Sequence, residues 1–341
     1  MTAGPPPHPH PALEVDGLGV SYGATRVLDG LTLAVGTGEA VAVLGPSGVG
    51  KSTLLHTVAG FVRPDAGEVR IDGRTVATAR SSDPPERRGV GMVFQSYALW
   101  PHLTAVDTVA YPLRRAGRAR AEARARATEL LDLMGIAHLA DRRPAQLSGG
   151  EQQRVGVARA LAREAPLYLF DEPTAHLDTA LRTTLQDELA NQRTALGAAI
   201  LYSTHDVAEA FAVADRVALV RDGAVLQVGP PEQIYEQPAD LWAARLTGVA
   251  STLETALVPA GASNVELPRT GTVLVRPEWV RLGGALPGRI VGVRYRGSDT
   301  DYRLDTPAGV VDVRHRGRPT AKVGESTGAT LDRVWLLTPR R

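Results

Sequence analysis

A glycine-rich segment that ends in a lysine and a serine carries the clearest chemistry in the sequence. Residues 45–52 read G-P-S-G-V-G-K-S. They follow the apolar run 40–44, and their last two residues begin the stretch 51–59, which has helical spacing. Glycines let backbone amides curl around phosphate oxygens, and the N-terminus of the following helix favours an anion. From such a loop Lys51 can reach the β- and γ-phosphates of a nucleotide, and the Ser52 hydroxyl can ligate Mg²⁺. The segment predicts a nucleotide-binding loop; the competing interpretation is a chance glycine turn.

An acidic pair, Asp171 and Glu172, follows a second apolar run at residues 167–170. A carboxylate at the carboxyl end of a strand, beside a phosphate loop, suits a Mg²⁺ site, usually through water. The adjacent Glu172 is expected to point elsewhere and to activate a water molecule against the γ-phosphorus. The pair therefore predicts metal binding and general-base chemistry, whereas an isolated Asp-Glu pair is commonly a solvent-facing turn.

A second anion-binding signature stands at residues 147–154, which read L-S-G-G-E-Q-Q-R. Ser148 is expected to cap a helix, and Gly149 and Gly150 keep the first amides of that helix open. One nucleotide does not need two complete phosphate-binding helix ends from one chain. The simplest account is that this second end serves a nucleotide held by another subunit; the alternative is an ordinary capped helix.

These motifs need a parallel sheet to bring them together. Apolar runs alternate with helical stretches at 153–163 and 179–196, which predicts an α/β fold with ligands at the carboxyl ends of the strands. Residues 114–134, rich in Ala, Arg and Glu, predict a helical insertion whose arginines form a solvated face. Strands are expected at 13–15, 19–22, 31–35, 40–44, 167–170, 198–202 and 217–220.

After Asp240 the pattern changes to short strands separated by Gly or Pro, which is typical of a small β-barrel or sandwich. These strands are expected at 272–275, 289–295, 301–305 and 310–315. We therefore predict a disordered lead-in at 1–12, an α/β domain at 13–240 with a helical subdomain at about 96–165, a linker at 241–250 with a helix at 241–247, and an all-β domain at 251–341.

Length and composition restrict the function classes. The 341 residues suggest about two domains, and 43% hydrophobic with 22% charged residues is an ordinary globular balance. The chain has no cysteine, which excludes disulfides, thiolate metal sites and a cysteine nucleophile. A net charge of +1 does not indicate nucleic acid as a partner. No run of about 20 apolar residues predicts a membrane span, and the N-terminus does not resemble a signal peptide, so a cytosolic protein is expected unless a partner carries it to a membrane.

Together these motifs resemble those of the ATP-binding subunits of ABC transporters, and the resemblance runs from about Leu13 through the whole chain. It identifies residues 45–53 with the Walker A motif, 147–154 with the ABC signature and 167–172 with Walker B. Three further residues match family positions: Tyr22 stacks on adenine, Gln95 contacts the metal and senses the membrane partner, and His205 binds the γ-phosphate. Without the resemblance, Tyr22 is an ordinary strand tyrosine and His205 an ordinary histidine after a strand.

The sequence departs from the family in the loop that contacts the opposite subunit. Residues 174–178 read T-A-H-L-D, where relatives commonly have serine at the position of Ala175 and a small residue or Asn at that of His176. The departure leaves Leu177 and Asp178 in place. Glu151 stands where relatives often have glutamine, which is a mild variation.

The C-terminal β region looks like the transport-associated OB domain of importer ATPases. The matching pieces are residues 275–278 (V-R-P-E) and 295–302. This appendage favours an importer over exporters, whose ATPase domain is usually fused to membrane helices. The Pro-His pair after Gln95 and the glycine Gly248 before the β domain look most like ferric-iron or polyamine importers.

The resemblance implies a homodimeric, ATP-hydrolysing subunit on the cytoplasmic face of the membrane. It is docked beneath two membrane-spanning permease subunits that receive solute from an extracytoplasmic binding protein. Each ATP is sandwiched with Mg²⁺ between Lys51 of one chain and Ser148 of the other. The implied catalytic residues are Glu172, His205 and Lys51, the metal ligands are Ser52, Gln95 and Asp171, and the nucleotide contacts are Tyr22, Gly45, Pro46, Ser47, Gly48, Val49, Gly50, Lys51, Ser52, Thr53, Gln95, Ser148, Gly149, Gly150 and Asp178.

Two other functions stay open at this point. A soluble regulatory ATPase would dimerise on nucleotide without a transporter, but the β domain and the hydrophobic segment 97–103 favour the transporter. A GTPase with the same phosphate loop is opposed by the signature helix and by Tyr22 as an adenine stack.

Overall fold

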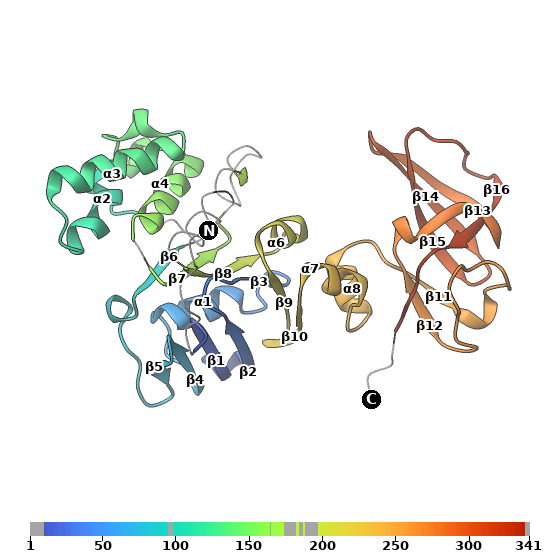
Figure 1. Cartoon of the computed structure of the whole chain (residues 1–341), viewed down its shortest axis with the longest axis horizontal. Coiled ribbons are helices and arrows are strands. Elements are labelled where there is room, and N and C mark those ends of the chain that lie inside the picture. The colour runs from blue at the N-terminus through green and yellow to red at the C-terminus, as the bar shows by residue number, and fades with distance from the viewer. Residues whose placement is uncertain are drawn as a thin grey trace, which may run out of the picture. The chain divides into compact units, whose positions relative to one another are not determined.

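The computed structural model describes residues 10–94, 98–163, 165–173, 182–183, 187 and 197–337. The chain divides into two compact units, Met1–Pro231 and Glu232–Arg341, whose elements are labelled in Figure 1. The expected lead-in at 1–12 lies outside the described residues up to position 9, and the expected helix at 179–196 lies almost wholly outside them. Among the described helices, none has the length and apolar character needed to cross a membrane.

A six-stranded sheet forms the centre of the first unit and confirms the predicted α/β class. Its order is β10-β9-β3-β8-β7-β6, and every neighbouring pair is parallel except β9 with β10. β3, β7 and β8 are buried along their whole length, as uninterrupted apolar runs predict. The strands are β3 (Ala40–Leu44), β6 (Val90–Val93), β7 (Leu167–Asp171), β8 (Ala199–Thr204), β9 (Arg216–Arg221) and β10 (Ala224–Gly229).

An antiparallel sheet of order β2-β1-β4-β5 forms the second layer of this unit. Helix α1 (Lys51–Ala59) lies between the two sheets in Figure 1, and its Leu54 and Leu55 join residues of both sheets in one hydrophobic core. β1 is one continuous strand where two were expected. Gly17, which has a φ of 56°, is accommodated within it at a shift in the register of β1 with β2. The strands are β1 (Leu13–Tyr22), β2 (Thr25–Val35), β4 (Ala66–Ile71) and β5 (Arg74–Thr78).

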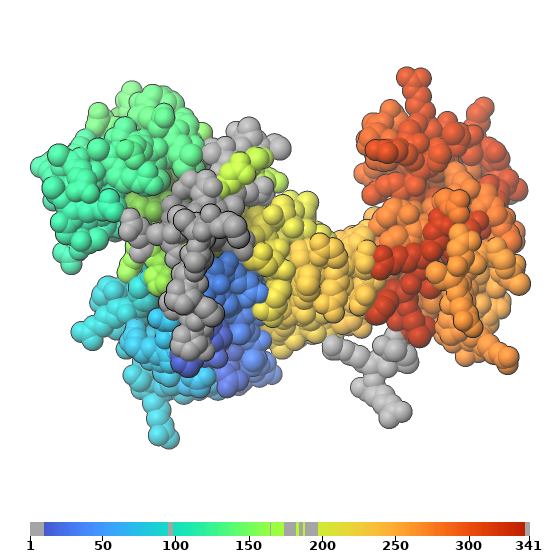
Figure 2. All heavy atoms as spheres, in the orientation of Figure 1, coloured from blue at the N-terminus to red at the C-terminus, as the bar shows by residue number. Residues whose placement is uncertain are grey.

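Helices α2 (Ala105–Arg115), α3 (Arg120–Leu133) and α4 (Gly149–Leu161) pack into a helical lobe, drawn as green spheres in Figure 2. The helical insertion expected at 114–134 is present as the end of α2 and the whole of α3, with a turn between them at Gly117, which has a φ of 92°. α4 begins at Gly149 with Ser148 as its cap, as predicted, and the helical stretch expected at 153–163 is the continuation of this helix. A further helix, α6 (Val207–Val213), follows β8.

The described residues of the second unit form mainly antiparallel strands, in sheets of order β11-β12-β17 and β15-β14-β13-β16. The strand expected at 289–295 is the end of a 16-residue strand, β13. Gly283 and Gly284 do not end this strand but form a bulge, since Leu282 and Leu286 both pair with Ala329. The elements are α7 (Pro231–Glu236), α8 (Leu241–Thr247), β11 (Ser251–Glu254), β12 (Thr272–Val275), β13 (Val280–Tyr295), β14 (Asp299–Thr306), β15 (Gly309–Arg316), β16 (Ser326–Leu331) and β17 (Trp335–Leu336).

A fully buried arginine, Arg276, joins α8 and the residues before it to the strands of the second unit. Its guanidinium donates to the carbonyls of Tyr235 (2.8 Å) and Ala244 (2.8 Å) and lies 4.1 Å from the centre of the Tyr235 ring. Burial lowers the pKa of Arg276, and the carbonyls replace the water that it loses. The boundary that we predicted after Asp240 therefore falls inside the second unit, which starts at Glu232.

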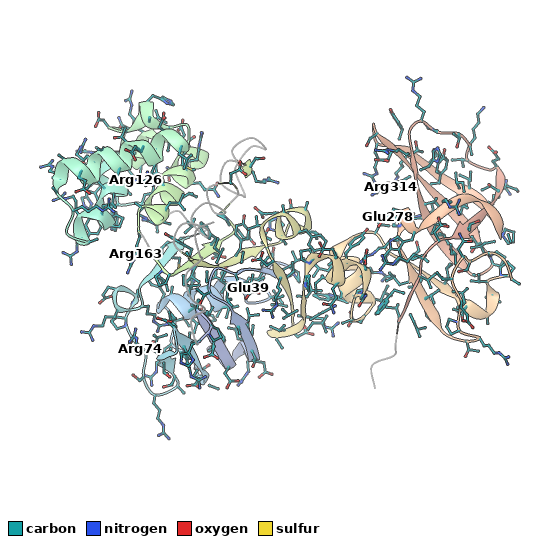
Figure 3. All side chains as sticks on the ribbon, in the orientation of Figure 1. Glu39, Arg74, Arg126, Arg163, Glu278 and Arg314 are labelled. Carbon is teal, nitrogen blue, oxygen red and sulfur yellow. The ribbon has the colours of Figure 1, made fainter. Side chains whose placement is uncertain are left out.

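The neighbouring Glu278 completes this junction. Its carboxylate accepts a hydrogen bond from the Tyr235 hydroxyl at 2.5 Å. Glu278 and Arg314 lie side by side in Figure 3. Burial and the Glu278 carboxylate raise the pKa of the Tyr235 phenol. The V-R-P-E segment noted in the sequence thus holds Tyr235 and α8 against the strands of the second unit.

Candidate functional site

The phosphate loop connects β3 to α1 and has the backbone that its glycines allow. Gly48 and Gly50 have φ values of 82° and 107°, in the left-handed region that favours glycine. A Cβ atom at Gly50 would lie 2.6 Å from Leu28 Cδ2, so this position requires glycine for space as well. Pro46, Ser47 and Gly48 are exposed, whereas the loop ends are buried. The loop is therefore held at its ends and open to a ligand along its middle.

The Lys51 ammonium is buried beneath the loop. Its Nζ donates to the carbonyls of Gly45 (2.8 Å) and Pro46 (3.1 Å) and lies 3.7 Å from Glu172 Oε1. Burial lowers the pKa of Lys51, while Glu172 and Asp171 oppose that shift. A compact cation in this place is the group that a phosphate loop uses to contact the β- and γ-phosphates.

Asp171 ends β7 beside the loop, with 1% of its surface exposed. Its Oδ1 accepts hydrogen bonds from the hydroxyls of Ser52 (2.9 Å) and Ser203 (2.7 Å). Carboxylate and hydroxyl oxygens are ligands that Mg²⁺ uses together with phosphate oxygens and water. Within the described ranges no cluster of three or more His, Cys, Asp or Glu side chains could hold a metal. The oxygen set of Ser52 and Asp171 fits a Mg²⁺ ion that arrives with a nucleotide.

Glu172 lies close to the Lys51 ammonium and to the His205 imidazole. Its Oε1 lies 3.4 Å from His205 Nδ1 and 3.7 Å from Lys51 Nζ. Its backbone has a φ of 47°, a strained value for a residue other than glycine that is common at functional sites. The Glu172 amide holds this conformation by donating to the Ser203 carbonyl (3.1 Å) and hydroxyl (3.2 Å).

A buried glutamate fixes the turn that carries His205. Glu209, with 4% of its surface exposed, accepts the hydroxyls of Tyr202 and Thr204 on β8. Its amide donates to Asp206 Oδ1 (3.1 Å), which caps α6. The His205 side chain itself is 60% exposed, so it is accessible to a ligand.

The signature residues form a separate, exposed helix end. Ser148 caps α4 in a reciprocal capping box, and its amide and hydroxyl both donate to Glu151 Oε2 (2.7 and 2.9 Å). These hydrogen bonds lower the pKa of Glu151. Gly149 and Gly150 form the first turn of α4. Within the described part of the chain, the side-chain contacts of Ser148 are with Glu151 and not with the phosphate loop.

The remaining predicted residues fall at the edges of the described structure or outside it. Tyr22 ends β1 and is 52% exposed, so its ring face is open to stacking. Gln95 and Asp178 lie outside the described residues, as do Ala175 and His176, at which the sequence departs from the family. The structure therefore brings together five predicted residues, namely Lys51, Ser52, Asp171, Glu172 and His205.

Two residues at this centre were missed in the sequence. Ser203 pairs in register with Asp171 across the parallel strands β7 and β8, and its hydroxyl contacts both acidic residues. His56 lies one helical turn after Ser52, and its Nε2 is 3.8 Å from Asp171 Oδ2. Ser203 carried a weak signal, because it ends the apolar run two residues before His205. The signal for His56 was its i, i+4 spacing from Ser52.

A groove of about 920 Å³ runs between the sheet and the helical lobe of the first unit. Aromatic rings of Phe61, Phe94, Trp100 and Tyr111 line it, and Phe61 and Tyr111 are 55% and 42% exposed. Arginines stand around these rings, including Arg163, which is labelled in Figure 3. Large exposed aromatic surface with cationic neighbours is typical of a protein-binding site.

Comparison with protein families supports both units. A family described as "ABC transporter" matches residues 28–175, and one described as "TOBE domain" matches residues 273–336. The chain is 38% identical to the Fe(3+) ions import ATP-binding protein FbpC of Agrobacterium fabrum, over 89% of this chain and 92% of that protein. It is 42% identical to FbpC of Streptomyces avermitilis, over 92% and 94%. It is 36% identical to the spermidine/putrescine import ATP-binding protein PotA of Legionella pneumophila, over 88% and 89%.

A solved structure shows the same fold. The first unit is similar to the ATP-binding cassette MJ0796, determined as a dimer in a post-hydrolysis state bound to ADP and Pi. The TM-score is 0.60 at 33% identity, and the match covers 64% of this chain and 98% of that one.

Proposed function

The chain belongs to the family of ATP-binding subunits of ABC transporters, and from that premise we propose that it powers the uptake of ferric iron or of a polyamine. The observation that carries the proposal is the convergence of Lys51, Ser52, Asp171, Glu172 and His205 at the carboxyl edge of the parallel sheet. The import relatives and the C-terminal TOBE match support the importer role. The solute classes are those named for these relatives.

In the proposed reaction, Glu172 acts as the general base. Its carboxylate orients a water molecule and accepts a proton as the water oxygen attacks the γ-phosphorus and the bond to the β-phosphate oxygen breaks. Lys51 and His205, which both lie near Glu172 Oε1, stabilise the charge on the γ-phosphate. The strained backbone of Glu172 and its two bonds to Ser203 keep this carboxylate in place before the substrate arrives.

Ser52 and Asp171 are the residues that would hold Mg²⁺, with Gln95 as a third ligand. When bound, the ion neutralises phosphate charge and fixes the phosphate geometry. Ser203 orients Asp171 for this role, since it donates to the same oxygen as Ser52. Burial of Asp171 keeps bulk water from competing for its hydrogen bonds.

We further propose that two copies of the chain sandwich two ATP molecules. Each copy supplies a loop centre around Lys51, while the exposed helix end at Ser148 has no role at that centre within the same chain. A phosphate of a second copy's ATP is the ligand that such an end favours. To accept it, the Ser148 hydroxyl exchanges its bond to Glu151 for a bond to the phosphate.

The aromatic groove is the proposed docking site for a cytoplasmic helix of a permease subunit. Phe94 lines it directly before Gln95, the residue expected to sense the membrane partner. We expect Tyr111→Glu to abolish association with the membrane fraction and to leave ATP binding intact. The control is Tyr295→Glu, an exposed tyrosine of β13 in the second unit. Membrane association that survives in Tyr111→Glu refutes this docking site.

Uptake in cells tests the transport role itself. Cells in which the native chain is replaced by Glu172→Gln should lose energy-dependent uptake of radiolabelled Fe³⁺ or of radiolabelled spermidine. A loss confined to one of the two identifies the solute class. Unchanged uptake of both contradicts the proposed function, and in that case the soluble regulatory ATPase is the better account.

A further inference from the structure

His56 has a polar contact that the chemistry described so far does not use. It stands four residues after Ser52 on α1, so the two side chains lie on the same face of the helix. Ser52 Oγ donates to Asp171 Oδ1 at 2.9 Å, and His56 Nε2 lies 3.8 Å from the other oxygen, Oδ2. A single helix therefore presents one polar group to each oxygen of the same buried carboxylate.

The His56 ring also packs near two aromatic rings that line the groove. Its ring centre lies 6.3 Å from that of Phe61, in an edge-on arrangement, and 6.1 Å from that of Phe94. Phe61 and Phe94 are themselves 5.2 Å apart, and both line the groove. These three rings form a continuous packed path from the groove wall to Asp171.

The backbone reinforces this path. The His56 carbonyl accepts the amides of Gly60 (3.0 Å) and Phe61 (2.9 Å), because α1 ends at Gly60, which has a φ of 95°. Phe61 is thus tied to His56 through the helix end as well as through ring packing.

We propose that His56 is a positioning residue, which orients the Asp171 carboxylate toward the metal and links its orientation to occupancy of the groove. The inference rests on the proposed function, because the groove acts here as the permease-docking site. The imidazole places Nε2 3.8 Å from Asp171 Oδ2, which is longer than a hydrogen bond but within electrostatic range, and a phenyl ring would place no polar atom there. Residues that orient metal ligands typically change metal affinity by about 10- to 100-fold when they are removed.

Metal binding to the free chain tests the first half of the proposal. In a Glu172→Gln background that retains ATP, Mn²⁺ affinity is measured by electron paramagnetic resonance. His56→Phe keeps an aromatic ring but removes the nitrogen, and we expect Mn²⁺ affinity to fall by about 10-fold. His56→Gln, which restores a donor at a similar reach, should recover most of the loss. The matched control is His315→Phe, since His315 also lies beside an aromatic ring, that of Tyr302, in the second unit.

ATP affinity in EDTA shows whether each variant is folded, and it should not change. If His56→Phe does not bind ATP in EDTA, His56→Leu replaces it in the comparison. Wild-type Mn²⁺ affinity in the folded variant, or equal losses in His56→Phe and His56→Gln, overturns the positioning role. Phe61→Ala tests the link to the groove: a weaker Mn²⁺ affinity supports it and an unchanged one refutes it. None of these measurements uses a permease, so their failure is distinct from a failure of uptake or docking.

Discussion

Replacing Lys51 by arginine keeps the positive charge and changes its shape, which makes it a stringent test of the loop geometry. Lys51 Nζ fits between the carbonyls of Gly45 and Pro46, at 2.8 and 3.1 Å, and its side chain is 4% exposed. A guanidinium is longer and planar, and it cannot occupy that space without displacing the loop or Glu172 Oε1 at 3.7 Å. Overpacking of this kind costs about 1–3 kcal/mol.

The larger effect is expected on turnover. Misplacing one group that stabilises transition-state charge costs about 10²- to 10³-fold in kcat. We therefore expect Lys51→Arg to reduce steady-state ATP turnover by at least about 100-fold. The assay is phosphate release by the purified chain and by its membrane complex. The matched control is Lys322→Arg, since Lys322 is the only other lysine and is exposed in the second unit. Turnover of Lys51→Arg within a few-fold of wild type would refute the argument.

Three further variants test other parts of the structure. Ser203→Ala removes a bond to the buried Asp171, worth about 1.5–3 kcal/mol for a charged acceptor, so kcat should fall by about 10-fold or more in a phosphate-release assay. Arg276→Met leaves the carbonyls of its junction without donors, and the Tm of the second unit should drop by more than about 5 °C by calorimetry, whereas the exposed Arg303→Met should change it little. Asp301 has a pKa below its ordinary value of about 3.9, chiefly through the Arg314 guanidinium. The stability that the ionised Asp301 contributes to the folded state is therefore complete above the ordinary pKa and is lost as the pH falls through the lower, folded pKa. Asp301→Asn should flatten the decline of Tm on acidification, and an unchanged decline contradicts this.

The sequence was sufficient for the motifs whose chemistry is local. The loop around Lys51 and the acidic pair Asp171–Glu172 were predicted because each combines a strand end with a short pattern of specific residue types. The loop and the acidic pair were expected to lie close together because the carboxyl ends of parallel strands share one edge of the sheet. The α/β class and the β-rich second unit were predicted for the same reason, namely the change in hydrophobic pattern.

Contacts between distant elements could not be predicted in this way. The role of Ser203 depends on its register opposite Asp171, and that register is set by the packing of β7 on β8. Arg276 lies in the V-R-P-E segment noted in the sequence, but nothing there predicted its burial against the carbonyls of Tyr235 and Ala244. The sequence predicted a strand only at 289–295, whereas β13 begins at Val280 and accommodates Gly283 and Gly284 in a bulge.

We propose that hydrolysis occurs at a site completed by a second copy of the chain. The most direct test is the mass of Glu172→Gln in solution, by light scattering, with and without ATP and Mg²⁺. We predict a single chain of 36.1 kDa without nucleotide and a stable species of twice that mass with ATP, together with loss of phosphate release. A chain that stays monomeric with ATP, or that still hydrolyses ATP at the wild-type rate, would contradict the account.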